Sequence, residues 1–240
     1  MTEPGTWQEK QHILVILAHP DDPEFFCGAT LARWIQAGHE ITYYLLTCGD
    51  KGRNEHNLDI EDNELCALRH LEQRAAAAVL GIKEVHFLDK EDGYLFPDLD
   101  LRREVVRAIR RFRPDILVTC DPQNVFAMYG LNHPDHRATG QAVLDAVFPA
   151  AGNELFFPEL LQEGLDPHTP KEVWVTLTNQ PDVSLDVTEL WETKIRALKE
   201  HKSQVGDLAK LEERLRSRHT EDSTPEKPRY EEKFKVVSWR

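Results

Sequence analysis

The sequence has no long hydrophobic run, and this absence limits where the protein can work. Its longest apolar stretch, Ile13 to Ala18, is far shorter than the roughly 20 residues that cross a bilayer, so we expect no membrane span. Residues 1–11 lack the basic start and the apolar core of a signal peptide. Both absences predict a cytoplasmic protein.

Cysteine and positive charge are also scarce. The chain has four cysteines, and no two of them form a CxxC pair: Cys27, Cys48, Cys66 and Cys120. This spacing favours reduced thiols over a disulfide framework or a cysteine-rich zinc site, which agrees with a cytoplasmic location. Acidic residues outnumber basic ones by 42 to 29, so the net charge is −13 and no nucleic-acid partner is expected.

The sequence instead contains short apolar segments that alternate with amphipathic helical ones. Strands are predicted at 13–18, 41–47, 85–88, 116–120, 173–177 and 183–187. Helices are predicted up to about 37 and at 64–80, 101–112, 134–147 and 189–202. This alternation predicts an α/β fold with a Rossmann-like, mostly parallel sheet flanked by helices on both faces. We expect one such domain at 1–204 and a helical, polar extension at 205–240 that packs on it.

Two polar motifs follow strands of the predicted sheet. Residues 19–24 read HPDDPE after the first strand, and residues 133–136 read HPDH after the fourth. Ligands in such sheets bind beyond the carboxyl ends of the strands, so both motifs are expected in one crevice. Either motif alone could be a capped turn with a solvated histidine, but the pair favours a metal site.

A catalytic zinc needs three nitrogen or oxygen ligands and one open position. His19, Asp22 and His136 supply that set, which leaves Asp21, His133 and Asp135 as the other polar groups. A carboxylate beside a liganding one can take a proton from a water that the metal activates, and an imidazole can protonate a leaving amine. The sequence has no GxGxxG, GxxxxGK[ST] or GxSxG motif, which disfavours nucleotide binding and a serine hydrolase.

These motifs resemble the LmbE-like (PIG-L type) zinc-dependent de-N-acetylases. The resemblance rests on residues 18–24, on Arg69-x-x-Glu72, on residues 133–136 and on His201-x-Ser203-Gln204, and it covers about residues 12–204. Members of the family remove an acyl group from an amide on an amino sugar or its conjugate. Their substrates include N-acetylglucosaminyl-phosphatidylinositol, chitobiose and precursors of mycothiol and bacillithiol. The resemblance therefore implies a small N-acetylated sugar as the substrate and a homo-oligomer.

The resemblance also assigns roles. It implies that His19, Asp22 and His136 bind the metal, with Zn²⁺ preferred and Fe²⁺, Co²⁺ or Mn²⁺ possible. It implies that Asp21 is the general base, that His133 stabilises the oxyanion or protonates the leaving amine, and that Asp135 orients His133.

Arg69 and Tyr129 are candidates for contacts with the substrate. Arg69 is expected to bind substrate, the alternative being an i, i+3 ion pair with Glu72 on a helix surface. Tyr129 is a candidate for holding the oxyanion, although some family members place a tyrosine where this sequence has Leu131.

Other functions remain compatible with the same residues. The site could act on a mycothiol-type conjugate amide or on a phosphoester. The protein could also be a catalytically silent metal-binding or sugar-binding protein, although Asp21 and His133 argue against a purely structural zinc site, which would fill all four positions with protein ligands.

Overall fold

A single seven-stranded sheet forms the centre of the protein. The computed structural model describes residues 4–53, 59–127 and 130–239. Its strand order is β3-β2-β1-β4-β7-β9-β8. The first five strands run parallel: β3 (Glu84–Lys90), β2 (Glu40–Thr47), β1 (His12–Leu17), β4 (Ile116–Cys120) and β7 (Glu172–Thr176). β9 (Glu231–Ser238) then pairs antiparallel with both β7 and β8 (Val183–Asp186). The prediction of a mostly parallel α/β sheet is confirmed.

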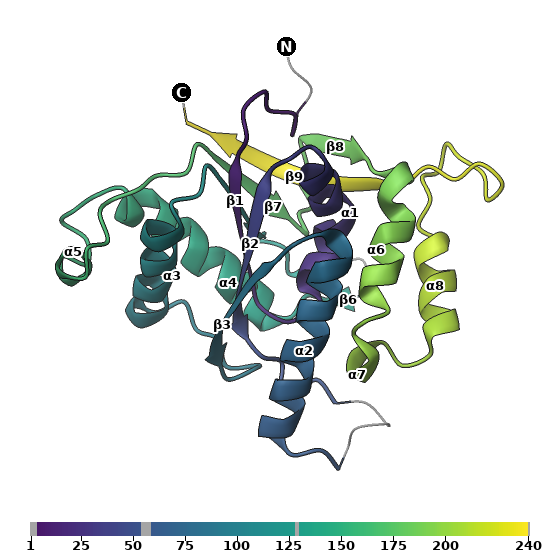
Figure 1. Cartoon of the computed structure of the whole chain (residues 1–240), viewed down its shortest axis with the longest axis horizontal. Coiled ribbons are helices and arrows are strands. Elements are labelled where there is room, and N and C mark those ends of the chain that lie inside the picture. The colour runs from purple at the N-terminus through teal and green to yellow at the C-terminus, as the bar shows by residue number, and fades with distance from the viewer. Residues whose placement is uncertain (1–3, 54–58, 128–129, 240) are drawn as a thin grey trace.

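Helices cover both faces of this sheet (Figure 1). One face carries α1 (Asp22–Gln36), α2 (Asp62–Leu80), α6 (Trp191–Leu198) and α8 (Leu208–Arg216), and the other carries α3 (Leu99–Phe112) and α4 (Pro134–Asp145). Alternate residues of β1 point into opposite layers: Ile13, Val15 and Leu17 join one core, while Leu14 and Ile16 join the other. Strands buried on both faces explain the unbroken apolar runs in the sequence.

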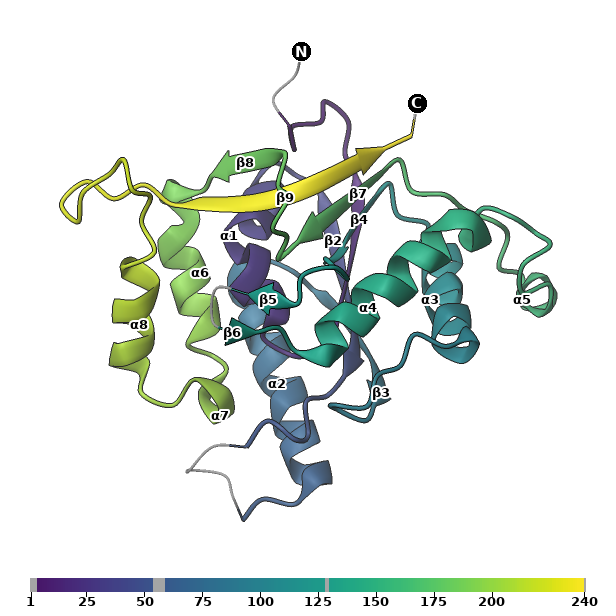
Figure 2. The same cartoon turned by 180° about the vertical axis from the view of Figure 1, so that it is seen from behind.

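Short elements complete the chain. They are a hairpin of β5 (Phe126–Ala127) and β6 (Gly130–Leu131), a π-helix η1 (Ala146–Ala151), α5 (Glu159–Gln162), a 3-10 helix η2 (Thr188–Leu190) and α7 (Lys202–Val205). Figure 2 shows the hairpin next to the start of α4, which is the helix that carries the second polar motif. In the described part of the chain, no helix combines the length and the apolar character that a membrane span requires.

Strand β9 lies in the segment where the sequence predicted a polar extension. The reason is Glu232, which occupies a buried position of the strand and so breaks its apolar alternation. Its carboxylate accepts hydrogen bonds from the backbone of Ala29 and Thr30 and lies 2.6 Å from the Lys194 ammonium. A buried charge that is fully paired can therefore replace an apolar residue in the core.

The expectation of four reduced cysteines is wrong for two of them. Cys48 and Cys66 form a disulfide, with their Cα atoms 5.1 Å apart, whereas Cys27 and Cys120 are free and buried. The two bonded residues are 18 positions apart in the sequence, and they belong to different elements, since Cys48 follows β2 and Cys66 lies on α2. Cysteine spacing alone could not reveal that contact.

Candidate metal centre and active site

The two polar motifs meet because β1 and β4 are neighbours in the sheet. His19 follows β1, and His136 lies in the first turn of α4, which begins after β4. Asp21 is the N-cap of α1 and has a φ of 91°, a left-handed conformation that few non-glycine residues adopt. Its backbone N–H is held by the side-chain oxygen of Gln73 at 2.8 Å, so this unusual turn is fixed by helix α2.

Three predicted ligands form one compact cluster. His19 Nδ1 lies 3.2 Å from His136 Nε2, and the two oxygens of Asp22 lie 3.3 Å from His19 Nδ1 and 3.0 Å from His136 Nε2. Each of the three residues is at most 7% exposed. Their ligand atoms are all within 4.8 Å of one another, so one ion could contact all three.

The outer contacts of the two imidazoles fix which ring nitrogens face each other. His136 Nδ1 lies 2.8 Å from the side-chain oxygen of Asn132, and His19 Nε2 lies 3.1 Å from Asp92 Oδ1. Both outer nitrogens therefore carry the proton when the rings are neutral, which leaves two lone pairs directed at each other and at Asp22. Two imidazole lone pairs and a carboxylate directed at one point are the donors that a divalent metal accepts, so the donor set fits such an ion.

Electrostatics in this cluster agree with an ionised Asp22. Burial raises the pKa of a carboxyl group, but the neighbouring His136 and His19 imidazoles outweigh it and hold the Asp22 pKa well below its usual range. Burial opposes charge on His19 as well, yet Asp22, Asp135 and Asp92 raise the pKa of this imidazole above its usual value. The site thus favours positive charge at its centre.

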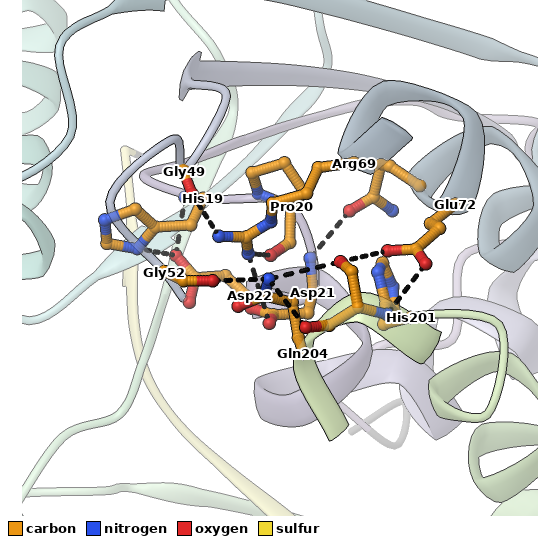
Figure 3. A network of polar contacts seen from close by, with 12 residues as sticks. His19, Pro20, Asp21, Asp22, Gly49, Gly52, Arg69, Glu72, His201 and Gln204 are labelled. Carbon is orange, nitrogen blue, oxygen red and sulfur yellow. Dashed lines mark hydrogen bonds and ion pairs between the residues drawn. The ribbon is translucent and has the colours of Figure 1, made fainter. Parts of the chain in front are cut away.

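Asp21 lies beside the cluster on the side of helix α2 (Figure 3). Burial raises the pKa of its carboxyl group, and the nearby Arg69 guanidinium opposes that rise. Arg69 Nη2 is 3.3 Å from Asp21 Oδ2 and donates to the Pro20 carbonyl at 2.6 Å, while Nη1 donates to the Gly49 carbonyl at 2.7 Å. Arg69 therefore joins the turn that carries Asp21 to the loop that follows β2.

Arg69 and Glu72 do not form the surface ion pair that was the alternative role of Arg69. Arg69 is only 3% exposed, and the Glu72 carboxylate accepts hydrogen bonds from the backbone and hydroxyl of Ser203 at 2.8 and 2.6 Å. Gln204, beside it, donates to the Gly52 carbonyl at 2.7 Å. Residues 201–204 of the sequence motif thus support the α2 side of the site (Figure 3).

His133 and Asp135 are close together, but their contacts differ from the expected ones. The Asp135 carboxylate accepts from the backbone N–H groups of Gly93 and Leu95 at 2.7 and 3.2 Å, and it lies 3.4 Å from His19 Nε2. His133 Nδ1 accepts instead from the Asp135 backbone N–H at 3.2 Å. Asp135 therefore contacts the ring of His133 through its backbone, and its carboxylate supports His19.

The half-buried ring of His133 lines the cavity beside His19, with a ring-centroid distance of 4.7 Å. Its Nε2 is 4.0 Å from Asp92 Oδ1, and burial lowers its pKa, an effect that the positive potential of His19 reinforces. His19, Asp92, His133 and Asp135 also offer ligand atoms within 4.8 Å of one another. The Asp135 carboxylate in that set is already satisfied by two backbone N–H groups, so the first cluster fits a metal better.

Sequence reasoning missed two acidic residues of the site. Asp92 contacts His19, but in a polar loop rich in acids nothing distinguished it beyond the expectation that residues 89–98 approach the site. Glu24 ends the first motif, is fully buried and accepts from Gln73, Tyr43 and His201 at 3.0, 3.2 and 3.2 Å. The Glu24 interaction raises the pKa of His201 although burial opposes it. Tyr129 lies outside the described residues.

The cluster opens into a cavity of about 1490 Å³. Asp21, Arg69 and His133 line it near the predicted metal ligands, and Phe25, Phe26 and Trp191 contribute aromatic surface. Residues from the C-terminal part of the chain form the far wall: Arg214, Ser217, Arg218, His219, Thr220, Glu221, Asp222 and Arg229. The cavity therefore combines a carboxylate, a guanidinium, an imidazole and a metal-type cluster at one end with mixed polar and aromatic walls.

Comparisons with known proteins agree with this arrangement. Residues 14–147 match the family model described as GlcNAc-PI de-N-acetylase (PIG-L). The chain is 33% identical over 198 residues to diacetylchitobiose deacetylase of Thermococcus kodakarensis, covering 82% of this chain and 72% of the relative. It is 28% identical over 200 residues to a probable N-acetyl-α-D-glucosaminyl L-malate deacetylase 2 of Bacillus anthracis, covering 82% and 83%.

A solved structure has the same fold over nearly the whole chain. N,N′-diacetylchitobiose deacetylase from Pyrococcus horikoshii, in complex with an inhibitor, superposes with a TM-score of 0.87 at 28% identity. The match covers 99% of this chain and 87% of the other. The likeness thus includes β8, β9 and α8 as well as the part of the chain that carries the polar motifs.

Proposed function

The chain belongs to the PIG-L family of de-N-acetylases and is an N-deacetylase, and from this premise we propose that it removes the acetyl group from a small N-acetylated amino sugar or sugar conjugate. The observation that carries this proposal is the meeting of His19, Asp22 and His136 beside Asp21 at one end of a large cavity. The named activities of the relatives in Thermococcus kodakarensis and Bacillus anthracis point to the same substrate class.

We propose zinc as the resident metal, held by His19, Asp22 and His136. When bound there, the metal would act as a Lewis acid that activates a water and polarises the amide carbonyl. The two imidazoles and one carboxylate suit zinc, although Fe²⁺, Co²⁺ and Mn²⁺ accept the same donors. Asp92 and Asp135 would hold the His19 ring in the orientation that directs Nδ1 to the ion.

Asp21 is proposed as the general base. Its carboxylate lines the cavity next to the ligand cluster, and its raised pKa makes it a better proton acceptor than an ordinary aspartate. Arg69 orients this carboxylate through one of the two hydrogen bonds of Nη2 and fixes the turn through the other. Arg69 also lines the cavity, so a contact with substrate hydroxyl groups is part of the proposal.

His133 is proposed as the group that stabilises the oxyanion and then protonates the departing amine. Amide hydrolysis needs such an acid because an amine anion is too basic to leave unprotonated. The His133 side chain is 40% exposed and lines the cavity, and its ring centroid lies 4.7 Å from that of His19. The backbone N–H of Asp135 fixes its ring. Burial and His19 lower the pKa of this imidazole, and the Asp135 and Asp92 carboxylates partly oppose that shift, so the protonated ring readily gives up its proton.

We also propose a domain organisation, an oligomeric state and a cellular location for the protein. Residues 1–204 would form the deacetylase domain, and residues 205–240 would be an extension that packs on it, adds β9 to its sheet and supplies part of the cavity wall. We also propose a homo-oligomer and a cytoplasmic location. The Cys48–Cys66 disulfide removes one of the arguments for that location.

Acetate release tests the proposed function. Purified protein is incubated with N-acetylglucosamine, diacetylchitobiose and N-acetylglucosaminyl malate, and acetate and free amine are measured with and without a chelator. We expect chelator-sensitive release of acetate and amine in equal amounts from at least one substrate, and release at least about a hundredfold slower from the Asp21→Asn variant. Phosphate release from a phosphoester without acetate, or sugar binding without turnover, would contradict the proposal and favour the alternative functions.

A further inference from the structure

A second cluster of metal-ligating side chains lies outside the catalytic cavity. Cys48, Cys66, His70 and Asp89 each offer one ligand atom, and these atoms all lie within 4.8 Å of one another. None of these four residues is among the described residues that line the catalytic cavity. We propose that they form a second metal site, which binds a thiophilic divalent cation such as Zn²⁺ when Cys48 and Cys66 are reduced.

Three elements of the fold build this cluster. Cys48 directly follows β2, Cys66 and His70 are one turn apart on α2, and Asp89 belongs to β3. Residues four positions apart lie on one face of a helix, so Cys66 and His70 point the same way. Parallel pairing of β2 with β3 places Cys48 and Asp89 at the same end of the sheet.

The imidazole of His70 is fixed in the middle of the cluster. Its Nε2 lies 2.9 Å from Asp89 Oδ1 and 3.8 Å from Cys66 Sγ, so one nitrogen faces both neighbouring donors. The ring stacks on Phe87 with a centroid distance of 3.7 Å, which holds its plane. A ligand nitrogen that is already oriented toward a carboxylate and a sulfur needs only a small movement to coordinate an ion with them.

The donor types differ from those of the catalytic cluster. Two thiolates, one imidazole and one carboxylate are a four-ligand set of the kind that zinc binds tetrahedrally, with no position left open for water. Thiolate ligands favour soft or borderline cations, whereas His19, Asp22 and His136 offer only nitrogen and oxygen. Cys66 and His70 are half-buried and the Asp89 side chain is 53% exposed, so an ion can reach the site from solvent.

The disulfide defines the condition for binding. Two molecules of a thiol reductant break the Cys48–Cys66 bond: the protein sulfurs gain two electrons and two protons, and the reductant becomes a disulfide. Binding of the cation then displaces the two thiol protons, and the two thiolates become ligands. A reducing compartment, such as the proposed cytoplasm, would favour the thiol form.

Cobalt binding tests this site independently of catalysis. Metal-free protein is prepared in a reduced and in an oxidised form, verified by thiol titration, and titrated with Co²⁺. Only a sulfur ligand gives an intense sulfur-to-cobalt charge-transfer band, and the catalytic cluster has no cysteine. We expect the band in the reduced protein alone, with about two ions per chain against about one in the oxidised protein.

Variants separate the two clusters. In the reduced state Cys66→Ser should lose the band and bind about one ion, whereas His136→Ala should keep the band and also bind about one ion. His70→Ala retains both thiols, so it controls for sulfur alone. We expect its cobalt affinity at the band to fall at least tenfold, since even a residue behind a ligand contributes about 10–100-fold.

Either of two results would overturn the proposal. One is a reduced wild-type protein that binds about one ion per chain without the band, which would make Cys48 and Cys66 a disulfide pair only. The other is a band of unchanged affinity in His70→Ala and Asp89→Asn, which would exclude the imidazole and the carboxylate as ligands. Because acetate release is not the readout, neither result bears on the proposed deacetylase activity.

Discussion

The two histidine clusters of this protein lie at the same end of one sheet, yet their surroundings differ. In the first cluster every donor is almost fully buried, and the outer nitrogens of His19 and His136 contact Asp92 and Asn132. In the second, Asp89 is exposed and two of the donors are joined in a disulfide. Clusters with similar ligand types thus differ in burial and in the contacts behind their imidazoles, and these two properties favour the first cluster as the proposed catalytic centre.

The largest expected effect is the loss of a ligand from the buried cluster. His136→Ala should lose the catalytic metal and lower turnover by about a thousandfold or more, because a Lewis acid contributes several kcal/mol to the transition state. Metal analysis and an acetate assay measure both effects, and circular dichroism checks that the variant folds. Full metal occupancy in this variant would remove His136 from the ligand set.

The base should matter nearly as much, but without a change in metal content. Asp21→Asn preserves the shape of the side chain and removes its ability to accept a proton. Turnover should fall by at least about a hundredfold, the scale of general base catalysis, while the metal content stays at the wild-type level. Wild-type turnover in this variant would exclude Asp21 as the base.

The outer contact of His19 should have a smaller effect. Asp92→Asn weakens the acceptor at His19 Nε2, so metal affinity should fall by about 10–100-fold, measured by competition with a chelator. Its neighbour Glu91, whose side chain is 59% exposed, provides the matched control Glu91→Gln. Equal affinities in the two variants would show that Asp92 does not support His19.

The smallest effect on turnover is expected from the second cluster. His70→Ala should change acetate release by no more than about twofold, the usual range for a substitution away from a functional site. The comparison with His136→Ala is direct, since both changes remove one imidazole from a cluster of similar size. A hundredfold loss in His70→Ala would mean that the two clusters act together in catalysis.

The sequence could predict the parallel part of the fold because four of its five strands, β1, β2, β4 and β7, are buried on both faces. Such strands leave continuous apolar runs, and the amphipathic helices between them have a clear period. Strand β9 was not predicted because Glu232 occupies a core position, where Lys194 and two backbone N–H groups satisfy its carboxylate. A charge paired through tertiary contacts cannot be told from a surface charge in the sequence.

The candidate site also contains residues that the sequence could predict and residues that only tertiary contacts reveal. His19, Asp22 and His136 could be predicted because each lies in a short motif that follows a predicted strand. Asp92 could not, since its contact with His19 depends on how the loop after β3 folds back. The carboxylate of Asp135 was expected at His133, but the backbone N–H groups of Gly93 and Leu95 hold it beside His19. Contacts made by loop backbone leave no pattern in the side chains.

A metal titration of acetate release tests whether an ion held by His19, Asp22 and His136 is required for catalysis. Protein freed of metal with a chelator receives Zn²⁺ in small steps, and acetate release from the best substrate is measured at each step. We predict activity that rises from zero and reaches its maximum at about one ion per chain in oxidised protein, where Cys48 and Cys66 are bonded to each other and the His19, Asp22 and His136 cluster is free to bind the ion. Full acetate release by metal-free protein would contradict this prediction.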